Sequence, residues 1–207
     1  MLNEELQVFD CEQGTEEWHQ ARAGIVTASV FSTVMAKGRG GGPSETRNKL
    51  LYQLAAERIT GEYVPTWSGN QHTERGKVME QQVRDLYEAT SPLPVRQVGF
   101  VRRGNVGASP DSLVGDEGLL EVKTKLPHLQ IEAVLAGVLP AEHKAQVQGQ
   151  LLVTGRMWCD FRSYWPGLPQ LSVRVYRDLE YMTTLRSAIL QFNAELDALV
   201  VKIRGMA

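Results

Sequence analysis

The chain has 207 residues, of which 43% are apolar and 22% are charged. This length suits one domain with a sizeable core, and the composition excludes a disordered or fibrous protein. The net charge is −2 and the pI is about 6.1, so the overall basic character of many small DNA-binding modules is absent. We expect a single domain over residues 1–207.

The cysteines and the hydropathy indicate neither secretion nor a membrane. Cys11 and Cys159 lie far apart and fit no metal-ligand spacing, which predicts free thiols in a reducing compartment. The sequence has no stretch of about 18 apolar residues, and its acidic N-terminal segment is unlike a signal peptide. We therefore expect a soluble, cytoplasmic protein.

The first ninety residues are predicted to be mostly helical. Thr15–Gly24 begins with a Thr N-cap and acidic residues and stops at a glycine, as a short helix does. A second helix is expected to start near Thr27 or Ser29. Apolar residues at helical spacing predict two longer helices, over residues 44–59 and 71–89.

The second half of the chain has a different pattern. Short β-branched segments separated by Gly and Pro predict a meander of strands between residues 95 and 124. Two helices, over residues 129–136 and 141–153, precede two more strands, and an amphipathic helix closes the chain. The predicted fold class is therefore α/β, with a central mixed β-sheet flanked by helices.

The clearest chemical pattern lies in the meander, on either side of the predicted turn GDEG. Glu121 and Lys123 alternate on one strand and so point to the same face, and a hairpin would bring Asp111 beside them. Carboxylates of this kind suit Mg²⁺ or Mn²⁺, and a neighbouring lysine can position the water that attacks phosphorus. An isolated Glu-x-Lys pair is more often a surface ion pair; Asp111 favours the catalytic interpretation.

Two helices carry further candidate residues. Glu80 can bring a third carboxylate to the sheet, although a solvated acid on a helix surface has the same spacing. Gln146, Gln148 and Gln150 interrupt a face of the helix 141–153 that should be apolar. A polar stripe at this position suggests a helix that faces a ligand.

A phosphate site is possible near the N-terminus. Arg22 and Ser29 flank the segment AGIVTA, where free amides, a hydroxyl and a guanidinium can bind a phosphate. Plain helix capping beside a solvated arginine is the simpler alternative. Lys37 and Arg39 lie in the glycine-rich stretch KGRGGGP, which either contacts a DNA backbone or connects two helices; without GK[ST] it is no P-loop.

Five segments, taken together, resemble a known family: EWHQARAGIVTAS, RGKVMEQQV, ASPDSLVG, LLEVKT and HKAQVQGQLLVTG. They are similar, in order and approximate spacing, to segments of phage lambda exonuclease and related viral recombination exonucleases, in the PD-(D/E)xK nuclease superfamily. The resemblance runs from about residue 12 to the final helix. It implies a restriction-endonuclease-like core and a processive exonuclease that digests linear double-stranded DNA from the 5′ end to mononucleotides. The remaining 3′ overhangs would serve a single-strand annealing protein in homologous recombination.

The same resemblance implies roles for individual residues. The expected cofactor is Mg²⁺, with Mn²⁺ as a substitute, in a two-metal site whose ligands are Asp111, Glu121, Glu80 and the Val122 carbonyl. Lys123 would position the nucleophilic water, and Gln146 matches the active-site glutamine of the family. Arg22 and Ser29 match the pair that grips a 5′-terminal phosphate, with Lys37 and Arg39 as nearby DNA contacts.

The resemblance also implies partners, and it leaves alternatives. Family members form ring-shaped homotrimers around DNA, which predicts a homotrimer, phage or prophage encoded, in a bacterial cytoplasm. A protein that encloses DNA needs positive potential only along its channel, so a pI of 6.1 is compatible with this function. His143 stands where the lambda enzyme has a tyrosine. The alternatives are another nuclease of the superfamily (an endonuclease or a RecB-type module) and a silent DNA-binding protein, against which Asp111, Glu121 and Lys123 argue. An iron–sulfur nuclease would need more cysteines.

Overall fold

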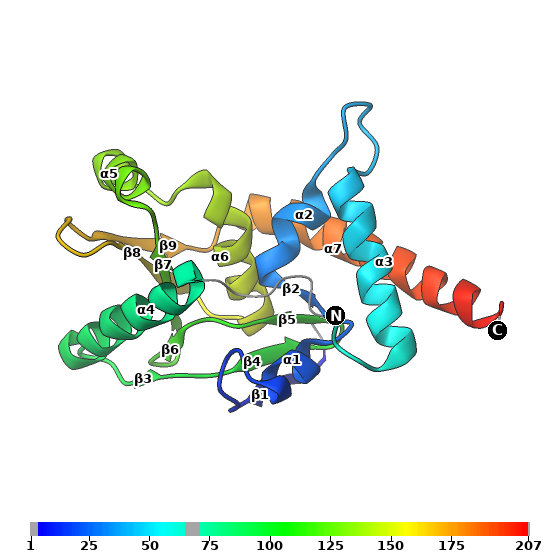
Figure 1. The fold of residues 1–207 in the computed structure, drawn as a ribbon, viewed down its shortest axis with the longest axis horizontal. Coiled ribbons are helices and arrows are strands. Elements are labelled where there is room, and N and C mark those ends of the chain that lie inside the picture. The colour runs from blue at the N-terminus through cyan, green and yellow to red at the C-terminus, as the bar shows by residue number, and fades with distance from the viewer. Residues whose placement is uncertain (1–3, 65–70, 207) are drawn as a thin grey trace.

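The computed structural model describes residues 4–64 and 71–206, without the side chains of residues 71–74 and 77. Its first elements are β1 (Leu6–Phe9), α1 (Glu16–Arg22), β2 (Val26–Thr27), the 3₁₀ helix η1 (Ala28–Val30), α2 (Phe31–Met35), α3 (Glu45–Thr60) and α4 (Gln71–Thr90). The strands β3 (Val95–Arg96), β4 (Phe100–Arg103), β5 (Val106–Ala108), β6 (Ser112–Val114) and β7 (Gly118–Thr124) follow. The chain ends with α5 (Pro127–Ala136), α6 (Ala141–Thr154), β8 (Trp158–Tyr164), β9 (Leu171–Tyr176) and α7 (Leu179–Arg204), as Figure 1 shows.

Helix boundaries follow local sequence signals. The Thr15 hydroxyl accepts a hydrogen bond from the Trp18 amide at the start of α1, and Ser44 accepts one from the Arg47 amide at the start of α3. Gly24, after α1, has φ of 68°, and a Cβ there would lie 2.5 Å from Cγ of Arg58. Only glycine fits this left-handed, crowded position, and it turns the chain from α1 toward β2.

The expected α/β class is confirmed, but the strands form two sheets where the sequence suggested one. The first has the order β1-β4-β5-β2 and the second the order β3-β6-β7-β8-β9. Both are mixed, because β2 pairs with β5, and β7 with β8, in parallel. The meander breaks after β5 at Ser109-Pro110, where proline has no amide hydrogen for a ladder. β4 pairs with β5 on one side and on the other with β1, an N-terminal strand that the sequence did not predict.

The second sheet positions the predicted chemistry. β6 and β7 form an antiparallel hairpin, with Ser112 opposite Leu120, and the turn at Gly115 has φ of 50°. The parallel pairing of β7 and β8 requires a crossover, which α5 and α6 supply. The predicted hairpin and the predicted helical crossover are thus confirmed.

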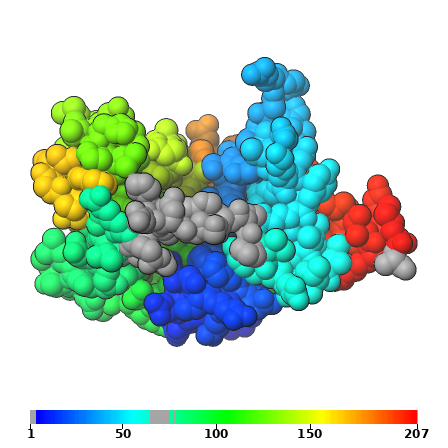
Figure 2. Space-filling model, in the orientation of Figure 1, coloured from blue at the N-terminus to red at the C-terminus, as the bar shows by residue number. Residues whose placement is uncertain are grey.

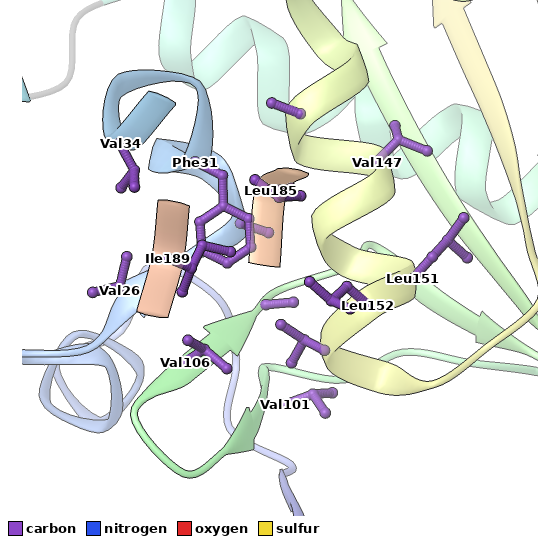
Figure 3. Packing of buried hydrophobic residues seen from close by; sticks show 14 of the residues in the cluster. Val26, Phe31, Val34, Val101, Val106, Val147, Leu151, Leu152, Leu185 and Ile189 are labelled. Carbon is purple, nitrogen blue, oxygen red and sulfur yellow. The ribbon is translucent and has the colours of Figure 1, made fainter. Parts of the chain in front are cut away.

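The two faces of β7 are covered by different helices. Leu120 and Val122 belong to a small core cluster with Val83 and Tyr87 of α4. Leu119, which points the other way, belongs to the main cluster, together with apolar residues of α6. This main cluster joins α6 to α2, α7 and the first sheet, as Figure 3 shows for Phe31, Val106, Leu151, Leu185 and Ile189. Glu121 and Lys123 therefore lie on the α6 side of β7.

Two segments stand out from the body of the molecule. The loop between α2 and α3, closed by a bridge between Lys37 and Pro43, projects at the top of Figure 2. The C-terminal end of α7 extends to the right of the same view. No helix in the described ranges is both long and apolar enough to cross a membrane.

Candidate functional site

Asp111 is tied to the strand that carries the other predicted residues. It lies just before β6, its backbone amide donates to the Leu120 carbonyl at 3.1 Å, and its Oδ2 accepts from the Val122 amide at 2.5 Å. The carboxylate is buried. Burial raises the pKa of Asp111 well above its usual range, and the negative charges of Glu121 and Glu80 raise it further.

Glu121 is buried in the middle of β7 and is surrounded by donors. Gln146 Nε2 donates to its Oε1 at 2.6 Å, and Gln150 Nε2 donates to its Oε2 at 2.6 Å. Both amides come from α6, where a spacing of four residues places them on one face. Lys123 Nζ lies 2.5 Å from Oε1 of the same carboxylate. The predicted proximity of Glu121, Lys123 and Gln146 is therefore present in the structure.

Lys123 is a charged donor in this arrangement. Burial lowers the pKa of its amine, but the charges of Glu121 and Asp111 outweigh that effect and raise the pKa above its usual value. An ammonium group can orient a water molecule by donating hydrogen bonds. As an ammonium group it has no lone pair with which to accept a proton from that water.

Glu80 reaches the cluster from α4. It lies close enough to Asp111 for a hydrogen bond between the two carboxyl groups, and it also feels the charges of Glu121 and Lys123. Burial raises the pKa of Glu80, while Arg84, whose Nη1 lies 3.4 Å from Oε1, lowers it. The carboxyl groups of Asp111, Glu121 and Glu80 thus form an acidic cluster beside Lys123. The alternative for Glu80 from the sequence was a solvated acid on the helix surface.

The chemistry of this donor set fits a hard divalent cation. Three carboxyl groups crowd together at a buried site, and a cation would relieve their mutual repulsion. Within the described residues, no three His, Cys, Asp or Glu side chains form a ready-made ligand set. The Glu121 carboxylate is instead held by Lys123 and the two glutamines. Val122 points its side chain into the α4 cluster, so only its backbone is available on this side.

A second polar site surrounds Arg22 at the end of α1. Its Nη1 donates to Ser109 Oγ at 3.0 Å, and its Nη2 lies 3.4 Å from Thr27 Oγ1 and 3.5 Å from Ser29 Oγ. The guanidinium also lies over the Trp18 ring, 4.1 Å from its centroid. None of the hydrogen bonds that Arg22 makes within the described part of the chain is to a carboxylate. Burial lowers the pKa of Arg22 to about 10.

The two sites are joined by Ser109, which precedes Asp111 by two residues. The Ser109 hydroxyl accepts from both Arg22 and the indole Nε1 of Trp18, each at 3.0 Å. The same indole nitrogen lies 2.9 Å from the Gly99 carbonyl, which fixes the ring against the first sheet. Glu57 acts on the Arg22 charge from a distance, but within the described residues the printed hydrogen-bond partners of the guanidinium are hydroxyl groups. A guanidinium held by hydroxyl groups is suited to bind an anion such as a phosphate.

A family model for the YqaJ-like viral recombinase domain matches residues 17–157, which include both sites. This chain belongs to that family. The resemblance to viral recombination exonucleases and the expected enzyme class, a nuclease, are confirmed. No curated protein sequence matches the chain.

Solved structures support the assignment of this YqaJ-like chain. LHK-Exo, an alkaline exonuclease from Laribacter hongkongensis, is 34% identical, with a TM-score of 0.82 over 93% of this chain and 97% of that one. A structure of LHK-Exo in complex with dAMP gives the same values. A phage related exonuclease from Haemophilus somnus 129PT has a TM-score of 0.63 at 16% identity, over 86% of this chain and 96% of that one, and shows the fold alone.

The YqaJ-like chain does not bring every predicted residue together. Lys37 and Arg39 are exposed on the loop between α2 and α3, which projects from the body of the molecule in Figure 2. Gln148 donates to the Tyr176 carbonyl at 2.8 Å and accepts from the Asp178 amide at 2.9 Å, so it joins α6 to α7. Gln146 and Gln150 on the same helix bond to Glu121 instead.

The sequence did not reveal three residues of the Arg22 site, and it gave only a weak indication of Gln150 beside Glu121. Trp18, Thr27 and Ser109 were not assigned to any site. Ser109 and Trp18 are 91 residues apart in sequence, so no local pattern could reveal their contact. Gln150 carried a signal, because it shares a helix face with Gln146.

Proposed function

We propose that this chain is a Mg²⁺-dependent exonuclease that digests one strand of linear double-stranded DNA from its 5′ end and leaves 3′ overhangs. Membership of the YqaJ-like viral recombinase family and the likeness to LHK-Exo support exonuclease chemistry. LHK-Exo binds dAMP, a nucleoside monophosphate, in one of its structures. Mononucleotides are accordingly the proposed product.

The observation that supports action at a DNA end is the placement of the Arg22 site beside the acidic cluster, and the 5′ polarity follows from the resemblance to the viral recombination exonucleases. Ser109 and Asp111 are two residues apart, so their backbones are separated by at most about 7 Å. A terminal phosphate on Arg22 and the adjacent phosphodiester at the cluster would then belong to one DNA end. An endonuclease has no need of a dedicated site for a terminal phosphate.

The proposed chemistry assigns a task to each residue of the cluster. Asp111, Glu121, Glu80 and the Val122 carbonyl would hold one or two Mg²⁺ ions, or Mn²⁺ as a substitute. When bound, such a cation stabilises negative charge on the phosphate and the leaving oxygen. Lys123 donates to and orients the attacking water. Asp111 and Glu121 are buried, which strengthens the charge interactions that these two carboxyl groups make.

The Gln146 amide would position the Glu121 carboxylate, and the residues around Arg22 would position the end of the substrate. Gln146 restrains Oε1 of Glu121 at 2.6 Å. Arg22 and Ser29, with Ser109 and Thr27, would bind the 5′-phosphate. Lys37 and Arg39, on their exposed loop, would contact the DNA backbone.

The proposed setting follows from the resemblance and the family. We propose a ring-shaped homotrimer around the duplex, acting with a single-strand annealing protein in homologous recombination. A phage or prophage gene would supply the protein to a bacterial cytoplasm. Size-exclusion chromatography with light scattering tests the assembly: a monomer at micromolar concentration contradicts the ring.

A comparison of DNA forms tests the proposed activity. Linear duplexes with 5′-phosphate or 5′-hydroxyl ends and a covalently closed circle are incubated with Mg²⁺ or with EDTA. The expected result is release of mononucleotides from the linear forms alone, faster from phosphorylated ends and abolished by EDTA. Cleavage of the closed circle would show an endonuclease instead.

A further inference from the structure

The second glutamine on Glu121 has a contact that no other residue duplicates within the described structure. Gln150 Nε2 donates to Glu121 Oε2 at 2.6 Å, whereas Gln146 and Lys123 both contact Oε1. Gln150 is fully buried and Glu121 is 1% exposed. Oε2 thus depends on one donor, and that donor cannot be replaced by bulk water.

The orientation of the Gln150 amide indicates that it serves Glu121. With Nε2 on the carboxylate, Oε1 of Gln150 is buried and has no hydrogen-bond partner among the described residues. A buried acceptor without a partner is costly, and an apolar side chain of the same size would fill the space without that cost. Packing alone therefore does not account for a glutamine here, while the bond to Glu121 does.

The donors around the Glu121 carboxylate leave one of its lone-pair sites unused. A carboxylate offers about four lone-pair sites, two on each oxygen. Gln146 and Lys123 use those of Oε1, and Gln150 uses one of Oε2. The remaining site is on Oε2, and the bond to Gln150 determines where it points.

We propose that Gln150 is a positioning residue for Glu121: its amide holds Oε2 and fixes the direction in which the carboxylate meets a divalent cation. This inference rests on the proposed metal-dependent nuclease activity and deepens it. Without Gln150, Gln146 and Lys123 still hold Oε1 of the Glu121 carboxylate, but Oε2 is no longer held and can change its direction. The consequence is a weaker metal site in a protein that still folds.

Gln148 provides a matched control on the same helix. It is also a buried glutamine, but it bonds to Tyr176 and Asp178 rather than to Glu121. The test compares the intact protein with Gln150→Met and Gln148→Met, by titration with Mn²⁺ alone in a calorimeter and by thermal unfolding. Methionine preserves side-chain length and removes the amide.

The expected result is a tenfold to hundredfold weaker affinity for Mn²⁺ in Gln150→Met, a range of about the size found when partners of metal ligands are removed. Gln148→Met should bind Mn²⁺ as the unaltered chain does, even if its melting temperature falls. In cleavage assays, the Mg²⁺ concentration for half-maximal rate should rise by the same factor in Gln150→Met. At saturating Mg²⁺, kcat should stay within about threefold.

Unchanged Mn²⁺ affinity in Gln150→Met overturns the inference, as does an equal loss in Gln148→Met, which would indicate general loosening of α6. If Gln150→Met shows no cooperative unfolding, Gln150→Asn decides by the same criteria, because it keeps the amide and withdraws it by one methylene. Since Mn²⁺ is titrated without DNA, the outcome is separate from the proposed polarity. Weakened binding combined with digestion from 3′ ends would overturn the proposed function alone.

Discussion

Replacement of Arg22 by glutamine should remove the preference for a 5′-phosphate without unfolding the protein. A hydrogen bond to a charged group contributes about 1.5–3 kcal/mol. A loss of that size corresponds to roughly a tenfold to hundredfold lower kcat/KM on phosphorylated ends. Ends that carry a hydroxyl lack the interaction, so their kcat/KM should change little.

The structure also allows the effect of Arg22→Gln on stability to be worked out. Burial lowers the pKa of Arg22 to about 10, which corresponds to a cost of about 3 kcal/mol for the charged form. Stacking on Trp18 offsets about 1 kcal/mol. The hydrogen bonds to Ser109, Thr27 and Ser29 offset about 1 kcal/mol or less each. These opposing effects nearly cancel, so the free energy of unfolding should change by no more than about 1 kcal/mol.

The assay measures kcat/KM on matched linear duplexes with either end, together with urea unfolding. Arg39→Gln is the contrasting variant, because Arg39 is exposed on the projecting loop and should affect both ends equally. An Arg22→Gln protein that keeps the full preference refutes the assignment of the phosphate site. A loss of several kcal/mol in stability would show that Arg22 is structural.

Three further changes have defined outcomes. Lys123→Ala should abolish single-turnover cleavage and leave duplex binding, measured by fluorescence anisotropy, within about threefold, because phosphate contacts elsewhere supply most affinity; near-normal turnover would contradict the role of Lys123. Burial, with the charges of Lys125 and Lys123, lowers the pKa of His143 from its usual 6.5 to about 4. The contribution of neutral His143 to the free energy of unfolding is therefore complete above pH 6.5 and is lost as the pH falls toward 4. The difference in free energy of unfolding between the unaltered chain and His143→Phe, measured in urea, should therefore change by about 2–3 kcal/mol between pH 7.5 and pH 4. A difference that stays constant would disprove the lowered pKa. Tyr87→Phe removes a buried 2.6 Å hydrogen bond to Asp160 and should cost about 1.5–3 kcal/mol in urea unfolding with unchanged KM, whereas an unchanged midpoint would contradict a stabilising bond.

The acidic cluster could be predicted because much of it is local in sequence. Asp111, Glu121 and Lys123 lie on a hairpin whose turn is marked by glycines, and alternation along a strand fixes which side chains share a face. Gln146 follows from helical periodicity once the crossover is recognised. In such segments the short-range rules and the fold agree.

The remaining features depend on contacts that short-range rules do not contain. β1 pairs with β4, whose residues lie 91 to 97 positions later in the chain, and this pairing belongs to a sheet separate from that of β7. The Arg22 site likewise needs Ser109, 87 residues away. Arg22 and Ser29 could be placed together from their spacing, but the hydroxyl of Ser109 could not. Tertiary packing decides such pairs, and the sequence pattern does not encode them locally.

The central claim, digestion from the 5′ end at the Asp111–Glu121–Lys123 cluster, is tested most directly by the order in which labelled nucleotides are released. One strand of a linear duplex carries a label on its 5′-terminal nucleotide in one sample and on its 3′-terminal nucleotide in another, and both are digested with Mg²⁺. The 5′ label should appear first, as a mononucleotide, and Lys123→Ala should release neither label. Earlier release of the 3′ label, or labelled oligonucleotides as first products, would contradict it.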